Sequence, residues 1–428
     1  MILLLICESL LLLLGLFGVQ ATEFEKVFEW KQLSFADLPD VRNGKGSAIL
    51  FPRVLGDADN ETFEAYNNIP MGATHYRNRL FITIPRRRPG VPVTLGVIDL
   101  SKVAPGDRSP PLTAYPTYPI NELRPQYEAD LRRLVSVYRT KVDACGRLWF
   151  VDTGMLEYPD NRRQVQRPQL WIVDLERDQL VRRFTIPASI VVEGVGMASV
   201  TVDVERDDCD GAFAYVPDLV ANAIYVYSMR ADEMWAFRNH SSFAHDPARA
   251  EFNVAGQRFR WDDGVFSVAV GQWDSEVGSR LIFYHPMVST TEFGTYASVL
   301  QSKAVALGGN FEGLFETLGE RGPATQSTMH HYDAGTGVVF YAEVNRNAIG
   351  CWNTKQVYGA DNHAVVHLDN RELIYPTDLT ADPDGTLWVL TNNLPIWIYS
   401  RLNESDFNFR VWRQDPAVAI RGTKCDNI

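Results

Sequence analysis

The sequence predicts an all-β fold, a six-bladed β-propeller with repeats about 50 to 70 residues long. The clearest repeat is residues 375–400, where two runs rich in β-branched and aromatic residues flank the turn at residues 382–385, Asp-Pro-Asp-Gly. Proline presets φ in such a turn, aspartate bonds its own backbone, and glycine accepts positive φ. The pattern recurs at residues 143–146, again followed by Leu-Trp. Large apolar residues mark one core position in each unit: Phe81, Trp149, Phe213, Ile282, Phe340 and Trp388.

The strands of each unit are predicted from β-branched and aromatic runs bounded by turn residues. In chain order they are residues 80–85 and 94–100; 169–174 and 180–186 around the Leu-Trp run; 199–204, 212–216 and 223–229; 266–270, 280–284 and 297–300; 328–332, 338–342 and 348–352; and 377–381, 386–391 and 396–400. An unclosed β-sandwich with similar short strands is the alternative. The shared internal order of six units favours the propeller.

The ring is expected to be closed by strands from the two ends of the chain. Residues 28–35 precede the first unit, and residues 407–412 follow the last one. A propeller closes when its first and last segments share a sheet, because this removes the exposed strand edges. We therefore expect these two segments to pair.

Residues 1–21 are predicted to be a signal peptide, which leaves residues 22–428 as the propeller domain. The alternative is a membrane anchor, but the apolar run at residues 10–17 is shorter than the roughly 20 residues that a span needs. The net charge of −12 argues against nucleic acid and anionic membrane surfaces as partners. We expect a secreted protein, with glycosylation acceptors at Asn60, Asn239 and Asn403.

Four cysteines remain after the predicted leader: Cys145, Cys209, Cys351 and Cys425. An even number in a secreted chain indicates two disulfides, and four cysteines allow three pairings. The favoured pairing joins Cys145 to Cys209, linking the turns of blades two and three. It also joins Cys351 to Cys425, which holds the C-terminal tail to blade five.

Propeller topology predicts where a site should lie. Residues that follow the second strand of each blade gather around one mouth of the channel, and they form a polar ring of mixed charge that suits a small ligand. The candidates after second strands are residues 86–88, Asp152, Thr153, Pro217, Asp218, His285, Glu343, Asn345, Thr391 and Asn392. The starts of inner strands add Met71, Thr328 and Thr377. Each residue alone is better explained as a hydrogen-bonded loop residue, but the convergence of six blades strengthens the case for the ring as a whole.

The sequence carries no HExxH, CxxC, GxSxG or phosphate-loop motif, so no cofactor is predicted. The pair His330 and His331 places successive side chains on opposite strand faces, which argues against joint metal binding. No metal is predicted.

Several stretches resemble the yellow / major royal jelly protein family of insects. They are RLFITIPRRRPGVPVTLGVIDL (79–100), GRLWFVDTGMLEY (146–158), RPQLWIVDL (167–175), DLVANAIYVYS (218–228), AIGCWN (348–353) and residues 375–400. The resemblance implies a secreted six-bladed propeller with four such cysteines. It implies cuticle pigmentation, dopachrome conversion, amine binding in the channel, or a nutritional or structural role. For amine binding, it implies Thr328 and Asn345 as the Thr and Asn at the mouth.

Four functions remain open from the sequence. An aminochrome isomerase needs a base and an acid, for which Glu343, Asp152, Asp218 and His285 are candidates by position. A non-catalytic binder of dopamine or serotonin would use Thr328, Asn345, Thr391, Asn392, Thr153 and Thr377. A patterning protein of pigmented cuticle would turn nothing over. Outside the family, a calcium-dependent lactonase-type propeller would use Glu343, Asn345, Asn392 and Asp218 as ligands.

Overall fold

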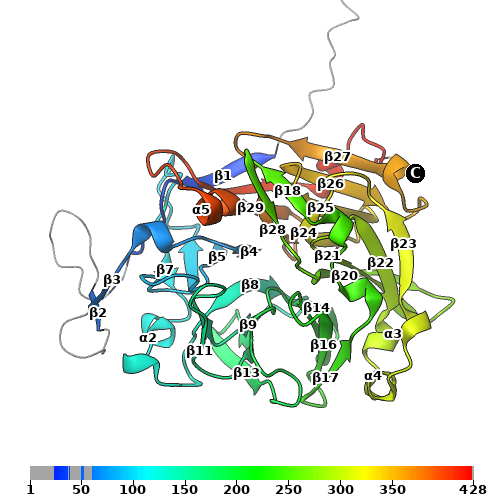
Figure 1. Cartoon of the computed structure of the whole chain (residues 1–428), viewed down its shortest axis with the longest axis horizontal. Coiled ribbons are helices and arrows are strands. Elements are labelled where there is room, and N and C mark those ends of the chain that lie inside the picture. Colours follow the sequence, from blue (N-terminus) through cyan, green and yellow to red (C-terminus); the bar gives the residue numbers. More distant parts are fainter. Residues whose placement is uncertain (1–23, 37, 39–49, 53–59, 427–428) are drawn as a thin grey trace, which may run out of the picture.

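Short antiparallel strands form six four-stranded sheets in the part of the chain that this computed structural model describes, residues 24–36, 38, 50–52 and 60–426. The sheets are arranged around a channel as the blades of a propeller (Figure 1). The predicted all-β propeller is therefore confirmed. The predicted signal peptide and Cys7 lie outside the described residues.

In the first three blades, the strands run from the channel outward in chain order. Blade one contains β4 (Gly72–Tyr76), β5 (Arg79–Thr83), β6 (Leu95–Asp99) and β7 (Thr113–Ala114). Blade two contains β8 (Val137–Val142), β9 (Arg147–Asp152), β12 (Gln169–Asp174) and β13 (Gln179–Thr185). Blade three contains β14 (Thr201–Glu205), β15 (Asp208–Asp218), β16 (Ala223–Ser228) and β17 (Glu233–Arg238).

The remaining blades follow the same plan, except that the outer strand of blade six comes from the start of the chain. Blade four contains β20 (Val265–Asp274), β21 (Ser279–Pro286), β22 (Thr291–Tyr296) and β23 (Glu316–Glu320). Blade five contains β24 (Ser327–Asp333), β25 (Val338–Glu343), β26 (Ala348–Asn353) and β27 (His363–Leu368). Blade six contains β28 (Pro376–Ala381), β29 (Leu387–Thr391), β30 (Phe409–Gln414) and β1 (Glu25–Trp30).

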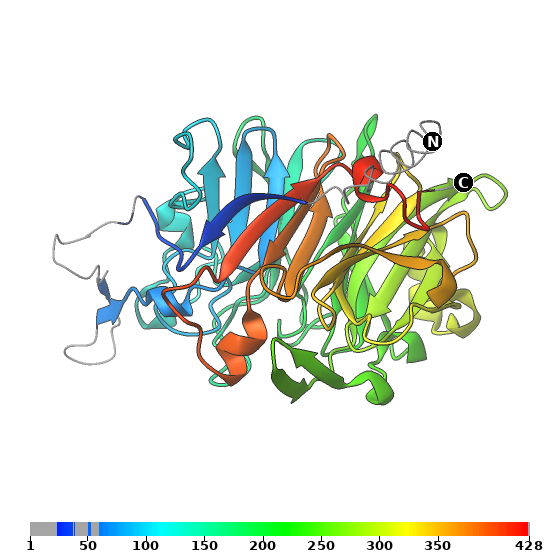
Figure 2. The same ribbon diagram turned by 90° about the horizontal axis from the view of Figure 1, so that it is seen from above.

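Blade six closes the ring with strands from both ends of the chain, as predicted. Strand β1 is antiparallel to β30, with Phe28 opposite Val411 and Trp30 opposite Phe409. Figure 2 shows the blue N-terminal strand alongside the red C-terminal strand. The innermost strand of blade six, β28, contacts β4 of blade one and β24 of blade five, so the inner strands surround the channel without a gap.

The recurring Asp–Gly turn has a physical basis in two blades. Asp143 accepts hydrogen bonds from two backbone amides of its turn and from the Trp149 indole at 2.7 Å. Asp382 does the same with its turn and with the Trp388 indole at 2.9 Å. Gly146 and Gly385 have φ values of 73° and 84°, a conformation that favours glycine. The aspartate thus fixes the turn and the buried tryptophan together, which explains their joint recurrence.

Two predicted strands are helical in the structure. Residues 297–300 form α3 (Ala297–Leu300), and the third strand of blade four is instead β22. The predicted strand at residues 396–400 lies largely in α5 (Leu394–Tyr399). Pro395 is at the start of α5, where its fixed φ and missing N–H favour a helix. The third strand of blade six is therefore β30, and β1 is the outer strand.

Both favoured disulfides are present, Cys145–Cys209 and Cys351–Cys425.

Three small two-stranded hairpins lie outside the six blade sheets in the described part of the chain. They pair β2 (Leu50–Pro52) with β3 (Asn60–Thr62), β10 (Met155–Leu156) with β11 (Arg163–Gln164), and β18 (Glu251–Val254) with β19 (Gln257–Arg260). The other short α-helices are α2 (Tyr118–Asn121), α4 (Lys303–Gly308) and α6 (Pro416–Ala419). Among the described residues, no helix is both long enough and apolar enough to span a bilayer.

Candidate active site in the channel mouth

A cavity of about 530 Å³ lies at one mouth of the channel, and we call it the mouth cavity. Its lining comes from loops that follow second strands, from α5 and from the loop before β20, and includes Arg87, Arg88, Leu219, Met287, Leu394 and Asp263. The cavity is therefore built where propeller topology predicts a site. Its volume suits a small aromatic ligand.

Asp263 presents a free carboxylate to the mouth cavity. Its backbone carbonyl is fixed by the amide of Val288, but its side chain makes no hydrogen bond or ion pair with any described residue. Burial, together with the charge of the adjacent Asp262, raises the pKa of Asp263 to about 6, against the opposing charge of Arg87. A carboxylate with this pKa is mostly ionised at neutral pH and is still a better base than an ordinary aspartate.

Three tyrosines line the cavity together with Asp263: Tyr138, Tyr158 and Tyr375. Burial raises the pKa of each phenol, so all three are protonated at neutral pH. No hydrogen bond from these hydroxyls to another described side chain competes with a ligand. The cavity thus combines a carboxylate base with neutral hydroxyl donors.

Two arginines add positive charge on one side. The Arg88 guanidinium stacks 3.6 Å from the centre of the Trp397 ring and donates to the Trp397 carbonyl at 3.3 Å. Arg87 Nε is buried without a hydrogen-bond partner among the described residues. A buried guanidinium N–H without a partner is costly, so this group favours an anionic or carbonyl oxygen in the cavity.

An aromatic cluster covers the cavity from the side of α5. The Trp261 indole donates to the Tyr399 hydroxyl at 2.6 Å, and Phe259 of β19 stacks on Tyr399 at 4.9 Å. In Figure 2 the orange-red helix α5 and the green hairpin of β18 and β19 lie on the same face of the ring. These rings provide apolar surface on which a planar ligand can stack.

Some predicted site residues lie in the mouth cavity and others do not. Thr377, Met71, Arg87 and Arg88 line it. Asn392 is buried beside it, and its amide donates to the Pro70 carbonyl at 2.8 Å. The remaining ligand-binding candidates are outside its lining: Thr328, Asn345, Thr391 and Thr153.

The four candidate catalytic side chains are also outside this lining. The Asp152 carboxylate accepts from the amides of Val135, Ser136 and Gly154. The Asp218 carboxylate accepts from the amides of Val220 and Ala221 and from the Tyr225 hydroxyl. Burial raises the pKa of both groups. Their geometry is that of loop-fixing carboxylates, and their predicted roles stay predictions.

Glu343 and His285 face the interior of blades four and five. Glu343 bonds to the His363 imidazole, and its other oxygen lies 3.3 Å from Arg346. His285 belongs to a buried group with Glu292, His330 and Arg321, which we call the blade cluster. In it, Glu292 lies 3.1 Å from His285, 3.2 Å from His330 and 2.6 Å from Arg321.

The blade cluster contains the donor types of a metal site. His285, Glu292 and His330 are the one group of three such ligands close enough to share an ion within the described ranges. Arg321 already supplies a positive charge to Glu292, and it also donates to the Ser289 and Thr325 carbonyls. The calcium set proposed from sequence is engaged elsewhere: Asn345 and Asn392 accept from the amides of Asn253 and Leu394.

The sequence prediction missed Asp262 and Asp263 because it considered only residues after second strands and the first residues of inner strands. The stretch Trp261-Asp262-Asp263-Gly264 directly precedes β20, and an acidic pair beside a tryptophan is the pattern that indicates it. No sequence pattern indicates that Tyr158 and Trp397 line the cavity, because Tyr158 lies in a loop and Trp397 in a helix that the repeat does not predict.

The chain matches one family model and several named relatives. The family model "Major royal jelly protein" matches residues 135–425. The chain is 48% identical to L-dopachrome tautomerase yellow-f of Drosophila melanogaster, over 94% of each chain. It is 33% identical to dopaminechrome tautomerase of the same species, over 95% of this chain and 84% of the relative, and 31% identical to protein yellow of Drosophila erecta, over 95% and 71%. The chain therefore belongs to the yellow / major royal jelly protein family.

Proposed function

We propose that the protein is a secreted isomerase of the melanin pathway that converts an aminochrome such as dopachrome into a dihydroxyindole in the mouth cavity. The observation that carries the proposal is the free Asp263 carboxylate, facing a cavity with protonated tyrosines and stacked aromatic rings. The similarity to L-dopachrome tautomerase yellow-f and to dopaminechrome tautomerase supports this substrate class.

The reaction is a proton rearrangement. Asp263 takes a proton from a ring carbon of the five-membered ring, and the electron pair of that C–H bond moves into the ring system. A quinone oxygen becomes a hydroxyl by accepting a proton from Tyr138, Tyr158 or Tyr375, which gives a quinone methide. A second shift, of a proton from the other saturated ring carbon to the second quinone oxygen, gives the dihydroxyindole. After each shift the proton on Asp263 returns through solvent to the tyrosine that gave one up. The product is an isomer of the substrate, and no electrons are exchanged with a second molecule. A positioned base or acid contributes roughly 10²- to 10⁴-fold to such a step.

The cavity walls orient the substrate for this transfer. Trp261 and Tyr399 provide a face for the flat bicyclic ring. Arg87 offers its unpartnered Nε to a quinone oxygen or to the carboxylate that dopachrome carries. Fixing the ring between these groups converts proton transfer into a step within one complex, which lowers its entropic cost.

The test is turnover by purified protein. We expect it to accelerate the loss of the coloured L-dopachrome and the appearance of a dihydroxyindole, followed by absorbance and by chromatography of the product. Loss at only the spontaneous rate, with both L-dopachrome and dopaminechrome, would contradict the proposal. Heat-denatured protein is the matched control.

The second candidate function is binding of a biogenic amine without turnover. The specific observation in its favour is the acidic pair Asp262 and Asp263 beside aromatic rings, which can pair an ammonium and stack its ring. Calorimetry with dopamine and serotonin tests it. Saturable amine binding without any dopachrome turnover would favour the amine-binding function over the isomerase. If neither binding nor turnover is found, the non-catalytic patterning function is favoured.

Secretion is part of the proposal. Two disulfides and the apolar residues 10–17 support it, since disulfides persist in oxidising compartments. Asn239 and Asn403 are exposed and available to a glycosylating enzyme. Expression of the full chain in insect cells tests this. We expect glycosylated protein in the medium that lacks residues 1–21, and retention inside the cells would contradict it.

A further inference from the structure

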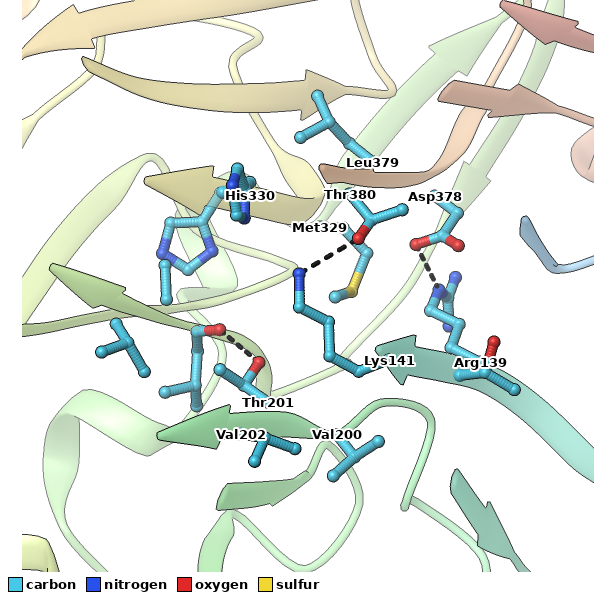
Figure 3. A pocket seen from close by; sticks show the side chains of 15 residues that line it. Arg139, Lys141, Val200, Thr201, Val202, Met329, His330, Asp378, Leu379 and Thr380 are labelled. Carbon is cyan, nitrogen blue, oxygen red and sulfur yellow. Dashed lines mark hydrogen bonds and ion pairs between the residues drawn. The ribbon is translucent and has the colours of Figure 1, made fainter. Parts of the chain in front are cut away.

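A second cavity, of about 90 Å³, lies deeper in the channel, and we call it the inner chamber. Five blades line it, each with three consecutive residues on its inner strand or directly at the start of that strand. These residues are 139–141, 200–202, 268–270, 329–331 and 378–380. Figure 3 shows these side chains around the chamber. Valines, Met329 and Leu379 make most of the wall apolar.

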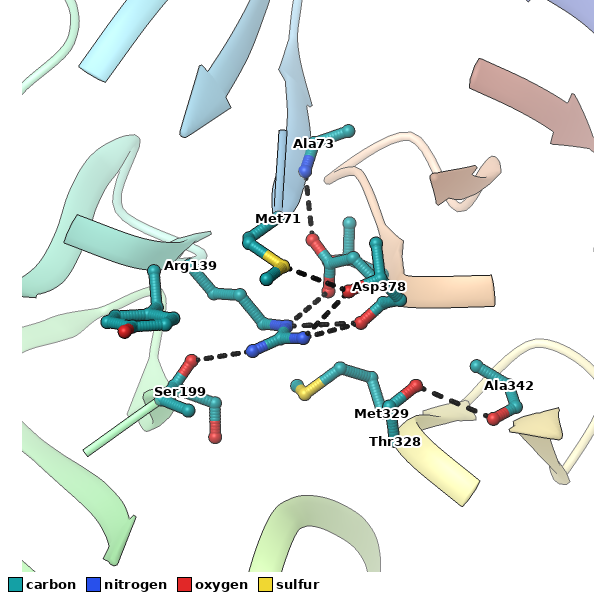
Figure 4. Close-up of polar contacts among 12 residues, drawn as sticks. Met71, Ala73, Arg139, Ser199, Thr328, Met329, Ala342 and Asp378 are labelled. Atoms are coloured by element: carbon teal, nitrogen blue, oxygen red, sulfur yellow. Dashed lines mark hydrogen bonds and ion pairs between the residues drawn. The ribbon is translucent and has the colours of Figure 1, made fainter. Parts of the chain in front are cut away.

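Arg139 lines both cavities and lies between them. Its guanidinium donates to the Thr377 carbonyl at 2.6 Å and to the Ala198 carbonyl at 2.9 Å, and lies 3.6 Å from the Asp378 carboxylate (Figure 4). Asp378 is held in turn by the amide of Ala73 at 2.9 Å. Arg139 is thus held by protein groups, and it lines both the inner chamber and the mouth cavity.

Lys141 lines the inner chamber and brings a primary amine to it. It lies two residues beyond Arg139 on β8, so both side chains point to the channel. Its Nζ donates to Thr380 Oγ1 at 3.1 Å, as Figure 3 shows, and it forms no ion pair with any described residue. A buried lysine held for the fold is usually paired with a carboxylate, because an unpaired charge is costly to bury.

The charged groups around Lys141 do not replace such a partner. Asp378 is paired with Arg139, and Asp382 bonds to His75 and the Trp388 indole. Burial lowers the pKa of Lys141 to about 8, although Asp378 and Asp382 oppose this shift. About a tenth of the amine is therefore unprotonated at neutral pH, roughly two hundredfold more than for an exposed lysine.

His331 and Arg139 complete the surroundings. Burial, together with the charge of Lys141, holds the pKa of His331 well below its usual range, so this imidazole is neutral and offers one N–H donor and one acceptor nitrogen. Desolvation in an apolar cavity is one of the arrangements that activate a lysine amine as a nucleophile. Lys141, in the largely apolar wall of the inner chamber, has this arrangement.

We propose that the inner chamber binds a small uncharged carbonyl compound, an aldehyde or ketone of up to about three carbons, and that Lys141 condenses with it. The neutral amine attacks the carbonyl carbon, and a C–N bond forms. A proton moves from nitrogen to oxygen, with His331 in place to relay it. Loss of water then leaves an imine, and no oxidant or reductant is needed. This site is independent of the proposed isomerase activity.

The experiment traps this imine in the intact protein. Acetaldehyde is added at neutral pH with cyanoborohydride, which reduces an imine to a stable secondary amine, and peptide mass spectrometry locates the ethyl group. We expect Lys141 to be modified about 10- to 100-fold faster than the exposed Lys102 and Lys303, in line with its greater unprotonated fraction. Benzaldehyde is the size control, because the chamber is too small for it.

Variants separate the site from general lysine reactivity. Lys141→Met and Lys141→Arg abolish the fast phase and leave the slow labelling of Lys102 and Lys303 unchanged. Their far-ultraviolet circular dichroism and L-dopachrome turnover report whether the propeller and its mouth are intact. Labelling of Lys141 no faster than Lys102, or equal labelling by benzaldehyde, overturns the proposal. Fast acetaldehyde labelling without any L-dopachrome turnover supports the inner chamber and contradicts only the isomerase.

Discussion

The mouth cavity and the blade cluster both contain charged side chains, which are half-buried at Asp263 and Arg87 of the mouth cavity and fully buried in the blade cluster. In the blade cluster Glu292 forms an ion pair with Arg321 at 2.6 Å and also contacts His285 and His330. In the mouth cavity, the Asp263 carboxylate and Arg87 Nε have no such partners among the described residues. Charge that is satisfied inside the protein stabilises the fold, whereas charge without a partner beside a cavity is available to a ligand.

This difference has a consequence for substitutions. Removing the Asp263 carboxylate or Arg87 should change catalysis and leave stability nearly unchanged, because the Asp263 side chain and Arg87 Nε make no hydrogen bond with the described residues. Removing a charge from the blade cluster should do the reverse, because it leaves another buried charge without compensation. Substitutions in the two regions should therefore separate activity from stability.

The largest effect is expected from Asp263→Asn. The amide keeps the shape but cannot accept the carbon-bound proton, so kcat for L-dopachrome should fall by about 10²- to 10⁴-fold. Steady-state kinetics measures this, and thermal unfolding should change little. Asp262→Asn is the matched control and should retain most of the activity. A kcat for Asp263→Asn within a few-fold of the native value would rule out Asp263 as the base.

Arg321→Met tests whether the charges of the blade cluster stabilise the fold. It removes the ion pair with Glu292 from a fully buried site, which should lower the free energy of unfolding by about 3–5 kcal/mol. Urea unfolding measures it. The control is Arg346→Met, since the Arg346 side chain is 30% exposed beside Glu343 and should cost less than about 1 kcal/mol. Equal losses for the two variants would show that burial of the pair does not matter.

Arg87→Met tests which substrate group Arg87 binds in the mouth cavity. If Arg87 Nε binds the carboxylate of dopachrome, the variant should raise KM for L-dopachrome about tenfold and leave KM for dopaminechrome, which lacks that group, nearly unchanged. Parallel kinetics on the two substrates measures the difference. Equal increases for both would mean that Arg87 contacts the ring oxygens that the substrates share.

The smallest effect is expected from Asp262→Asn on pH dependence. The Asp262 charge is the second cause, after burial, of the raised pKa of Asp263. Without it the pKa of Asp263 falls, so the acidic limb of the kcat/KM profile should move to lower pH by less than about one unit. An unchanged or upward-moved limb would show that Asp262 does not act on the base.

Much of the fold is predictable because its signals are local. The Asp–Gly turns mark strand ends, and Asp143 and Asp382 also hold the neighbouring tryptophans. The residues of α5 were predicted to be a strand because Ile396 to Ser400 is apolar and aromatic, which suits either structure. The helix forms because Pro395 begins it and because Trp397 and Leu394 bury against blade six.

The site was only partly predictable. Topology predicts the end of the channel at which the mouth cavity lies, and residues 87, 88 and 377 line that cavity. The direction of a side chain at a strand end depends on the hydrogen-bond donors nearby: Asp152 is the last residue of β9, and its carboxylate accepts from the amides of Val135 and Ser136. These donors come from another part of the chain, so strand order alone does not reveal them.

The pH dependence of kcat/KM for L-dopachrome tests the central claim most directly. Asp263 must be ionised to act as a base, so activity should be lost as pH falls through about 6 and should level off above it. The spontaneous rate is subtracted at each pH, and Asp263→Asn should lack this limb. A profile that is flat from about pH 5 to about pH 7, or the same limb in Asp263→Asn, would contradict the assignment.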